Sequence, residues 1–127
     1  MSEMGIFRTT VSIENPVRPG ELRGLSGVMV DTGSEYTWIP RAVLESIAIE
    51  PKRVARFATA DGRVLERSVG FANVYAGGTS APDIVVFADE GDMTLLGARA
   101  LEGLNLRVDL VSRTLVPAGP VPVASAA

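Results

Sequence analysis

Four consecutive residues, Asp31-Thr32-Gly33-Ser34, form the one run in this chain with a chemical interpretation. They directly follow Val28-Met29-Val30, a continuously apolar stretch typical of a strand that is buried on both faces. A carboxylate at the end of such a strand can be held by backbone N–H groups, and Gly33 lets the backbone approach it without a Cβ atom. Asp31 is therefore the candidate group for acid or base chemistry.

One carboxylate is not sufficient for the hydrolysis of an amide. The reaction needs a base that takes a proton from water and an acid that protonates the carbonyl oxygen, and two carboxylates about 3 Å apart that share one proton supply both. The chain has no second Asp-Thr-Gly or Asp-Ser-Gly run. If two chains meet about a two-fold axis, however, a residue near that axis lies opposite its own copy. The required pair would then be Asp31 from each of two chains.

The composition removes most other kinds of catalysis. The 127 residues include no cysteine and no histidine, which excludes thiol nucleophiles, imidazole bases, disulfides and conventional zinc sites. Catalysis must use carboxylates, hydroxyls or the single lysine, Lys52. We expect no metal and no cofactor.

The charge balance and the beginning of the chain bear on partners and location. Twelve basic residues against 15 acidic ones give a net charge of −3, without the concentrated basic surface that attracts phosphate backbones, so nucleic acid is not an expected partner. Residues 1–4 have neither a basic region nor an apolar run, and no stretch approaches the length of a membrane span. We expect a soluble, cytoplasmic protein that binds no membrane.

The elements that must position Asp31 are predominantly strands. Runs of β-branched and apolar residues predict strands, and Gly, Pro, Asn and Asp mark the turns between them. The predicted strands are residues 5–13, 22–30, 54–60, 64–69, 71–75, 84–87, 106–111 and 114–117. Short helices are expected at residues 42–47, between Pro40 and Pro51, and at residues 98–104. The length fits one domain over residues 1–117, followed by an unstructured tail over residues 118–127.

The pair Asp61-Gly62 lies between two strand-like runs. An Asp-Gly pair in this setting is a strong short-range signal for a β-hairpin. We therefore place a hairpin tip at Asp61-Gly62-Arg63.

Several motifs together resemble a known family. The run from Val28 through Trp38-Ile39-Pro40 resembles the aspartic proteases, whose pepsin-like members share the Trp-aliphatic-Pro spacing after the same four residues. The single copy of the motif, the Asp-Gly hairpin further along and Leu95-Leu96-Gly97 before a short helix resemble the retroviral-type branch, the homodimeric retropepsins. The closing segments, residues 106–110 and 114–116, are most similar to cellular and bacterial retropepsin-like proteins. The resemblance spans residues 8–117.

The resemblance implies an all-β fold with one or two short helices, namely the half-barrel of a bilobal acid protease, working as a homodimer. It implies that Asp31 binds the attacking water jointly with its mate, that Thr32 braces the two loops across the dimer, and that Gly33 offers its backbone to the carboxylate and the substrate. Ser34 lies where the family has Ser or Ala. A hydroxyl donated to an ionised carboxylate lowers its pKa. We therefore expect activity to be highest at acidic pH, and Ser34→Ala to move the acid limb upward.

The resemblance also assigns a flap to Ala60, Asp61, Gly62 and Arg63, which closes over the substrate and hydrogen-bonds to it. Two features depart from the family. The tip has a single glycine and charged neighbours, whereas the flap of viral enzymes is richer in glycine. The viral Gly-Arg-Asp/Asn signature is absent because Arg99 is displaced by one position, and the sequence assigns this arginine no ion-pair partner.

We therefore expect an aspartic endopeptidase that acts on extended peptides as a homodimer. An alternative from a different class is a non-catalytic dimeric β module that binds peptides or scaffolds a complex. A third is an enzyme that is active only after processing or inside a larger assembly. Asp31-Thr32-Gly33 is also compatible with an ordinary turn capped by its aspartate, and Trp38 is interpreted as packing in the core or the wall of a pocket.

Overall fold

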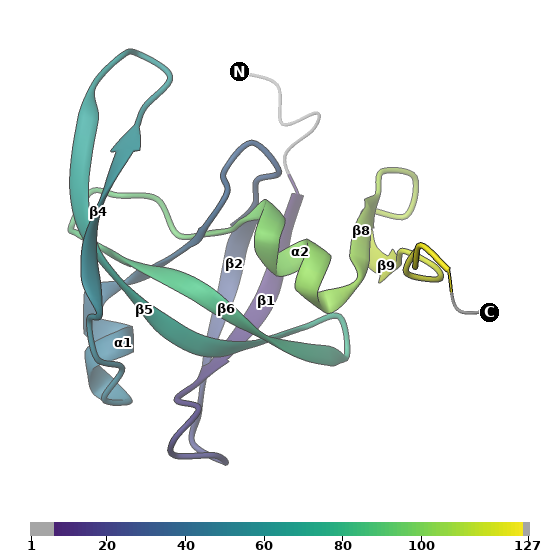
Figure 1. Cartoon of the computed structure of the whole chain (residues 1–127), viewed down its shortest axis with the longest axis horizontal. Helices are drawn as coiled ribbons and strands as arrows, with labels where there is room; N and C mark the ends of the chain where they lie inside the picture. Colours follow the sequence, from purple (N-terminus) through teal and green to yellow (C-terminus); the bar gives the residue numbers. More distant parts are fainter. Residues whose placement is uncertain (1–6, 126–127) are drawn as a thin grey trace.

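Nine strands and two short helices make up the described part of the chain, residues 7–125, in the computed structural model (Figure 1). The strands are β1 (Phe7–Glu14), β2 (Leu22–Val30), β3 (Thr37–Pro40), β4 (Arg53–Ala58), β5 (Val64–Ala76), β6 (Thr79–Ala88), β7 (Leu95–Leu96), β8 (Leu106–Asp109) and β9 (Thr114–Pro117). The helices are α1 (Arg41–Ser46) and α2 (Ala98–Leu104). The prediction of an all-β protein with one or two short helices is confirmed, and two are present.

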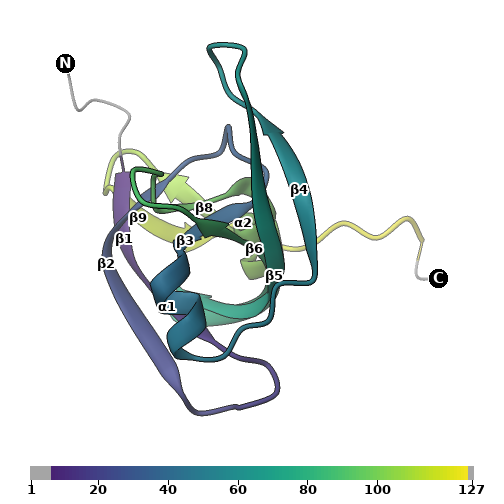
Figure 2. The same ribbon diagram turned by 90° about the vertical axis from the view of Figure 1, so that its left-hand side faces the viewer.

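Seven of the strands form one curled sheet in the order β1-β2-β7-β3-β6-β5-β4. The sheet closes on itself because residues 12–14 of β1 also pair with residues 73–75 of β5. The short strand β7 lies between β2, to which it is parallel, and β3, to which it is antiparallel. Strand β4 remains at a free edge, and β8 and β9 form a separate hairpin (Figure 2).

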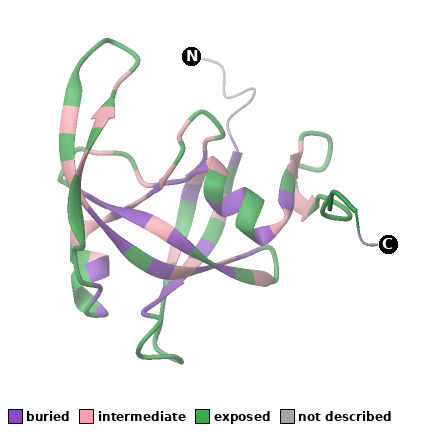
Figure 3. Ribbon diagram, in the orientation of Figure 1, coloured by how far each residue is buried: buried purple, intermediate pink, exposed green. Residues whose placement is uncertain are grey.

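The core lies inside this curled sheet and beneath the two helices. Val11 and Ile13 of β1, Val28 of β2 and Val85 of β6 have no exposed surface, and Figure 3 shows the buried positions alternating along the strands. Fully burying a side chain of this size contributes about 1.5–3 kcal/mol. The end of β2 is therefore held firmly, with Val28 and Val30 buried and Met29 between them partly exposed.

Strand β5 differs from the prediction. Residues 64–69 and 71–75 were expected to be two strands, but β5 runs without a break from Val64 to Ala76. Gly70 lies within this strand where the chain near Glu50 approaches closely, because a Cβ atom there would lie 2.6 Å from the backbone oxygen of Glu50. Strand β6 is also longer than residues 84–87, and β3 and β7 were not predicted as strands. Strands as short as β3 and β7 are determined by their neighbours in the sheet rather than by their own sequence.

The two ends of the chain complete the comparison. Residues 5 and 6 of the first predicted strand lie outside the described residues, as do 126 and 127 of the predicted tail. Residues 118–125 contain no helix or strand. The start of this tail is nevertheless held by Asn105: the Ala118 N–H donates to the Asn105 backbone carbonyl, and the Asn105 side chain donates to the Gly119 carbonyl. Within residues 7–125, neither helix is long and apolar enough to cross a membrane.

Candidate active site

Asp31 lies at the end of β2, half-buried at the start of a loop. Its backbone N–H donates to the Leu96 carbonyl at 3.0 Å, so β7 holds the residue from the side. Its backbone carbonyl accepts a hydrogen bond from the Ser34 N–H at 3.2 Å. The backbone of Asp31 is therefore fixed while its side chain remains accessible. We call residues 31–36 the active-site loop.

Gly33 contacts the carboxylate of Asp31 directly. Its backbone N–H donates to Oδ1 of Asp31 at 2.9 Å, and a Cβ atom at this position would lie 3.2 Å from the same oxygen. A side chain at this position would press on the carboxylate, which would have to shift by a few tenths of an ångström. Thr32 is exposed beside it.

The expected hydrogen bond from Ser34 to Asp31 is absent from this structure. The Ser34 hydroxyl donates instead to the backbone carbonyl of Tyr36 at 3.0 Å. A hydroxyl has one proton to donate, so Ser34 stabilises the loop rather than the Asp31 carboxylate. The sequence-based reason for a shift of the acid limb in Ser34→Ala is therefore wrong.

The start of α2 supports the loop from behind. The N–H groups of Ala98 and Arg99 donate to the carbonyls of Ser34 and Glu35, at 2.7 and 3.1 Å. Gly97 packs against the loop so closely that a Cβ atom would lie 2.4 Å from the carbonyl oxygen of Tyr36. Sequence reasoning named Gly97 only as part of a family element and missed this contact, whose one signal is a glycine directly before a predicted helix.

The structure provides the partner of Arg99 that the sequence left unassigned. Its Nη1 lies 3.8 Å from Oε1 of Glu35, so the displaced arginine still reaches the active-site loop. The two side chains are 51% and 70% exposed. An ion pair this exposed contributes between 0 and about 1 kcal/mol, so the backbone hydrogen bonds, rather than the charges, join α2 to the loop.

The hairpin tip forms where it was predicted. Within it, the Thr59 N–H donates to the Arg63 carbonyl at 2.9 Å, and Gly62 adopts a φ of 87°, which favours glycine. Nε of Arg63 lies 3.0 Å from Oδ2 of Asp61. The hydroxyl of Thr59, as the largest cause, and Arg63 hold the pKa of Asp61 below its usual value. Ala60 is exposed at the same tip, and in Figures 1 and 2 the hairpin projects from the same upper side as the active-site loop.

Aromatic side chains connect this hairpin to the loop. The ring of Phe57 on β4 packs edge-on against Trp38 of β3, with centroids 5.0 Å apart, and against Tyr36, with centroids 5.8 Å apart. Edge-to-face pairs of this kind add about 0.5–1.5 kcal/mol beyond the burial of their surface. The interpretation of Trp38 as a packing residue is consistent with these contacts. The end of β4 that leads into the hairpin tip therefore packs against residues that follow Asp31.

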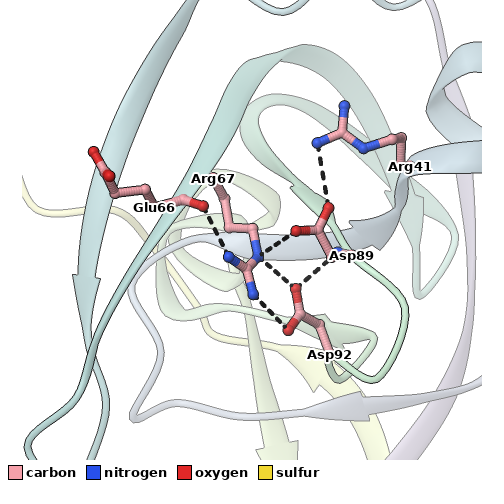
Figure 4. A network of polar contacts seen from close by, with 5 residues as sticks. All are labelled: Arg41, Glu66, Arg67, Asp89 and Asp92. Carbon is pink, nitrogen blue, oxygen red and sulfur yellow. Dashed lines mark hydrogen bonds and ion pairs between the residues drawn. The ribbon is translucent and has the colours of Figure 1, made fainter.

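An ionic network anchors the second strand of the hairpin (Figure 4). Nε and Nη2 of Arg67 on β5 contact the two carboxylate oxygens of Asp92 at 2.7 and 3.1 Å. Arg67 also lies 3.3 Å from Asp89, which in turn pairs with Arg41. The Arg67 and Asp92 side chains are only 16% and 12% exposed. This two-point contact joins the hairpin to the loop that leads into β7.

An apolar groove of about 920 Å³ adjoins the active-site loop at Thr32. Thr32 lines it together with Val30 of β2, Leu101 of α2 and residues of β8 and the tail. Leu110, at the turn of the β8-β9 hairpin, also lines the groove and is 73% exposed, and the next residue, Val111, is 95% exposed. The predicted strand 106–111 thus ends at Asp109, and its last two residues form an exposed apolar tip.

Comparison with known proteins identifies one family. The model of a family described as gag-polyprotein putative aspartyl protease matches residues 26–103. The matched segment contains the active-site loop, the β4-β5 hairpin and the Leu95-Leu96-Gly97 element, and it ends inside α2. A search of curated proteins found no match.

Proposed function

Since the chain belongs to the family of gag-polyprotein putative aspartyl proteases and has the retropepsin-like fold, we propose that it is an endopeptidase whose catalytic pair consists of Asp31 from two copies. The observation that carries the proposal is the geometry of Asp31. Its carboxylate is accessible, its backbone is fixed by β7, and Gly33 holds one of its oxygens. The same geometry provides only half of the acid and base that amide hydrolysis requires.

The proposed reaction uses one shared proton. One Asp31 takes a proton from water while the water oxygen bonds to the carbonyl carbon, and the other Asp31 gives its proton to the carbonyl oxygen. The C–N bond then breaks as the nitrogen takes a proton from the first Asp31 and the second Asp31 takes a hydroxyl proton from the tetrahedral intermediate, so that a carboxylic acid and an amine leave and the pair keeps one proton. Two carboxyl groups about 3 Å apart cannot both ionise readily, so the pair holds one proton at acidic pH.

The surface beside Thr32 supports a homodimer. Thr32 of the active-site loop and Leu110 both line the apolar groove, and the exposed Val111 follows Leu110 at the tip of the β8-β9 hairpin. Burial of this tip in the groove of a second copy would bring the two loops toward a common axis, where Thr32 of each could hydrogen-bond to the other. The free edge of β4 then remains for an extended peptide, which pairs with such an edge through its backbone.

The first experiment compares the wild type with Asp31→Asn on an unfolded protein substrate between about pH 3 and 7, where a carboxylate pair titrates. We expect the wild type to cleave, with the substitution reducing the rate to background while the chain remains folded. Equal cleavage by both proteins would contradict the proposal. A folded wild-type dimer without cleavage would favour the non-catalytic peptide-binding module or the assembly-dependent enzyme.

The second experiment tests the dimer with two valine variants. Val111→Arg places a charge on the proposed interface, whereas Val17→Arg places one on an 82% exposed valine of the β1-β2 loop. Sedimentation should show a monomer for Val111→Arg and a dimer for Val17→Arg and the wild type, with cleavage lost only in the monomer. A Val111→Arg protein that remains a dimer and cleaves would exclude this interface.

A further inference from the structure

The free edge of the β4-β5 hairpin carries an arginine that the proposed reaction does not use. Arg53 is the first residue of β4, which pairs with β5 on one side and has no strand on the other. Side chains alternate along a strand, so Arg53 shares a face of β4 with Ala55 and Phe57. Phe57 packs against Tyr36 and Trp38. The face that carries Arg53 is therefore turned toward the active-site loop.

The last residue of the active-site loop contacts the guanidinium of Arg53. Nη2 of Arg53 donates a hydrogen bond of 3.5 Å to the hydroxyl of Tyr36. The backbone of Tyr36 is fixed, because its carbonyl accepts the Ser34 hydroxyl at 3.0 Å and lies against Gly97. The Tyr36 hydroxyl is the acceptor in its contact with Arg53, so its own proton remains for another acceptor, and the guanidinium keeps further donors in its planar fork. Two sources of hydrogen-bond donors thus lie together beside the loop.

The positive charge of Arg53 has no counter-ion within residues 7–125. Its side chain is exposed, and no carboxylate in that range forms an ion pair with it. The other charged side chains of the hairpin and the active-site loop already form pairs, namely Lys52 with Glu50, Arg63 with Asp61, Arg67 with Asp92 and Arg99 with Glu35. Arg56 also has no ion pair, but it lies on the opposite face of β4, in register with Glu66 of β5. Arg53 is therefore the free cation on the face of the hairpin that meets the loop.

We propose that Arg53 and Tyr36 bind a carboxylate of the substrate, so that the protein selects extended peptides with a glutamate or aspartate opposite Arg53. A peptide that pairs with the free edge of β4 places the opposing side chain on the same face, with the two Cβ atoms about 4.5–5.5 Å apart. A carboxylate there can accept two hydrogen bonds from the guanidinium, or one from the guanidinium and one from the Tyr36 hydroxyl. The position of the peptide rests on the proposed function, whereas recognition of the carboxylate requires no cleavage.

The first arm of the test measures cleavage of a peptide panel. Apolar, uncharged peptides carry one glutamate at successive positions, and each is compared with the same peptide carrying glutamine. At one position of the panel, kcat/KM of the wild type should be about three- to fivefold higher for glutamate, the size expected of an exposed ion pair. This ratio should approach one near about pH 3, because a glutamate side chain has a pKa of about 4.3 and is neutral there. Equal cleavage of the two peptides at every position would overturn the proposal.

Three variants separate recognition from a structural role. Arg53→Glu should reverse the preference, so that a peptide with lysine at the selected position is cleaved faster than the peptide with glutamate. Loss of a merely structural arginine would not produce this reversal. Tyr36→Phe keeps the ring against Phe57 but removes the hydroxyl, and it should lower the preference for glutamate. Arg56→Glu, the matched control on the opposite face of β4, should retain that preference. A preference for glutamate that survives in Arg53→Glu would overturn the proposal.

The second arm measures binding to the Asp31→Asn protein, and it separates this inference from the proposed function. Trp38 is the only tryptophan of the chain, and it packs against Phe57 of β4, so its fluorescence reports on a peptide bound at this strand. The glutamate peptide should bind about three- to fivefold more tightly than the glutamine peptide. This difference should weaken at high salt and disappear when Arg53→Gln is added.

The two arms together distinguish the two failures. Tighter binding of the glutamate peptide without cleavage by the wild type would contradict the proposed function and leave the carboxylate site standing. Cleavage by the wild type without any preference for glutamate would support the proposed function and contradict the carboxylate site. Absence of both cleavage and binding would contradict both.

Discussion

The contact between Gly97 and the active-site loop permits a quantitative prediction. In Gly97→Ala, the added Cβ atom would lie 2.4 Å from the carbonyl oxygen of Tyr36, 2.6 Å from its carbonyl carbon and 2.9 Å from the Ser34 oxygen. All three are backbone atoms, so no side chain can rotate to make room. The φ and ψ of Gly97 are −92° and 178°, which alanine adopts freely. The predicted cost is therefore steric.

The magnitude follows from the two ways in which the clash can be relieved. Overpacking of a filled site costs about 1–3 kcal/mol. Movement of the loop away from α2 also weakens the hydrogen bonds that Ala98 and Arg99 donate to it, each worth about 1 kcal/mol net. Alanine recovers about 0.4–1 kcal/mol through the lower entropy of the unfolded chain. We expect a net loss of about 2–4 kcal/mol, or about 10 °C in Tm for a domain of this size.

Denaturant unfolding followed by circular dichroism measures this loss. Gly24→Ala is the matched control, because the nearest atom to its added Cβ is Oγ of Ser12, 3.9 Å away. Its stability should equal or slightly exceed that of the wild type. If Gly97→Ala were as stable as Gly24→Ala, the packing of Gly97 against the active-site loop would not be a constraint on the fold, and the reasoning would be refuted.

Two further predictions concern the ionic groups. Arg67→Lys keeps the charge but loses the two-point contact with Asp92, so it should lower the free energy of unfolding by about 1.5–3 kcal/mol. Arg41→Lys, at an exposed ion pair, should change the free energy of unfolding by less than about 1 kcal/mol. Equal effects of the two substitutions would contradict the role of burial. The Gly20 N–H, as the largest cause, and the Asn73 and Tyr75 side chains lower the pKa of Glu14. Its folded-state pKa lies below the unfolded value, so its contribution to stability is present above that value and is lost as the pH falls through the folded-state pKa. The Tm difference between the wild type and Glu14→Gln should therefore shrink upon acidification, and a constant difference would exclude the linkage.

Local sequence patterns were sufficient for the general architecture and for the candidate catalytic residue. Asp31 at the end of an apolar run, the Asp61-Gly62 turn and the two short helices all depend on residues that are close together in the chain. Turn chemistry and periodicity act over a few residues, so these elements can be predicted without a tertiary structure. The single copy of the motif also predicted that one chain holds only half of a catalytic pair.

The supports of the active-site loop depend on the tertiary structure. The Ser34 hydroxyl was predicted to reach Asp31, but the turn of the loop directs it to the Tyr36 carbonyl. The Gly97 N–H bonds to Thr37, 60 residues away in the chain, and the two-residue strand β7 exists because β2 and β3 lie on either side of it.

Arg99 and Asp83 show the same limit. Their residue types were plain in the sequence, but whether Arg99 reaches Glu35 and whether Asp83 is buried depends on how α2 packs against the sheet. Charge and hydrogen-bonding capacity belong to a residue, whereas burial, partners and therefore pKa belong to its neighbours in space. The residue types thus determined which chemical groups this protein has, and the fold determined which of those groups lie in contact.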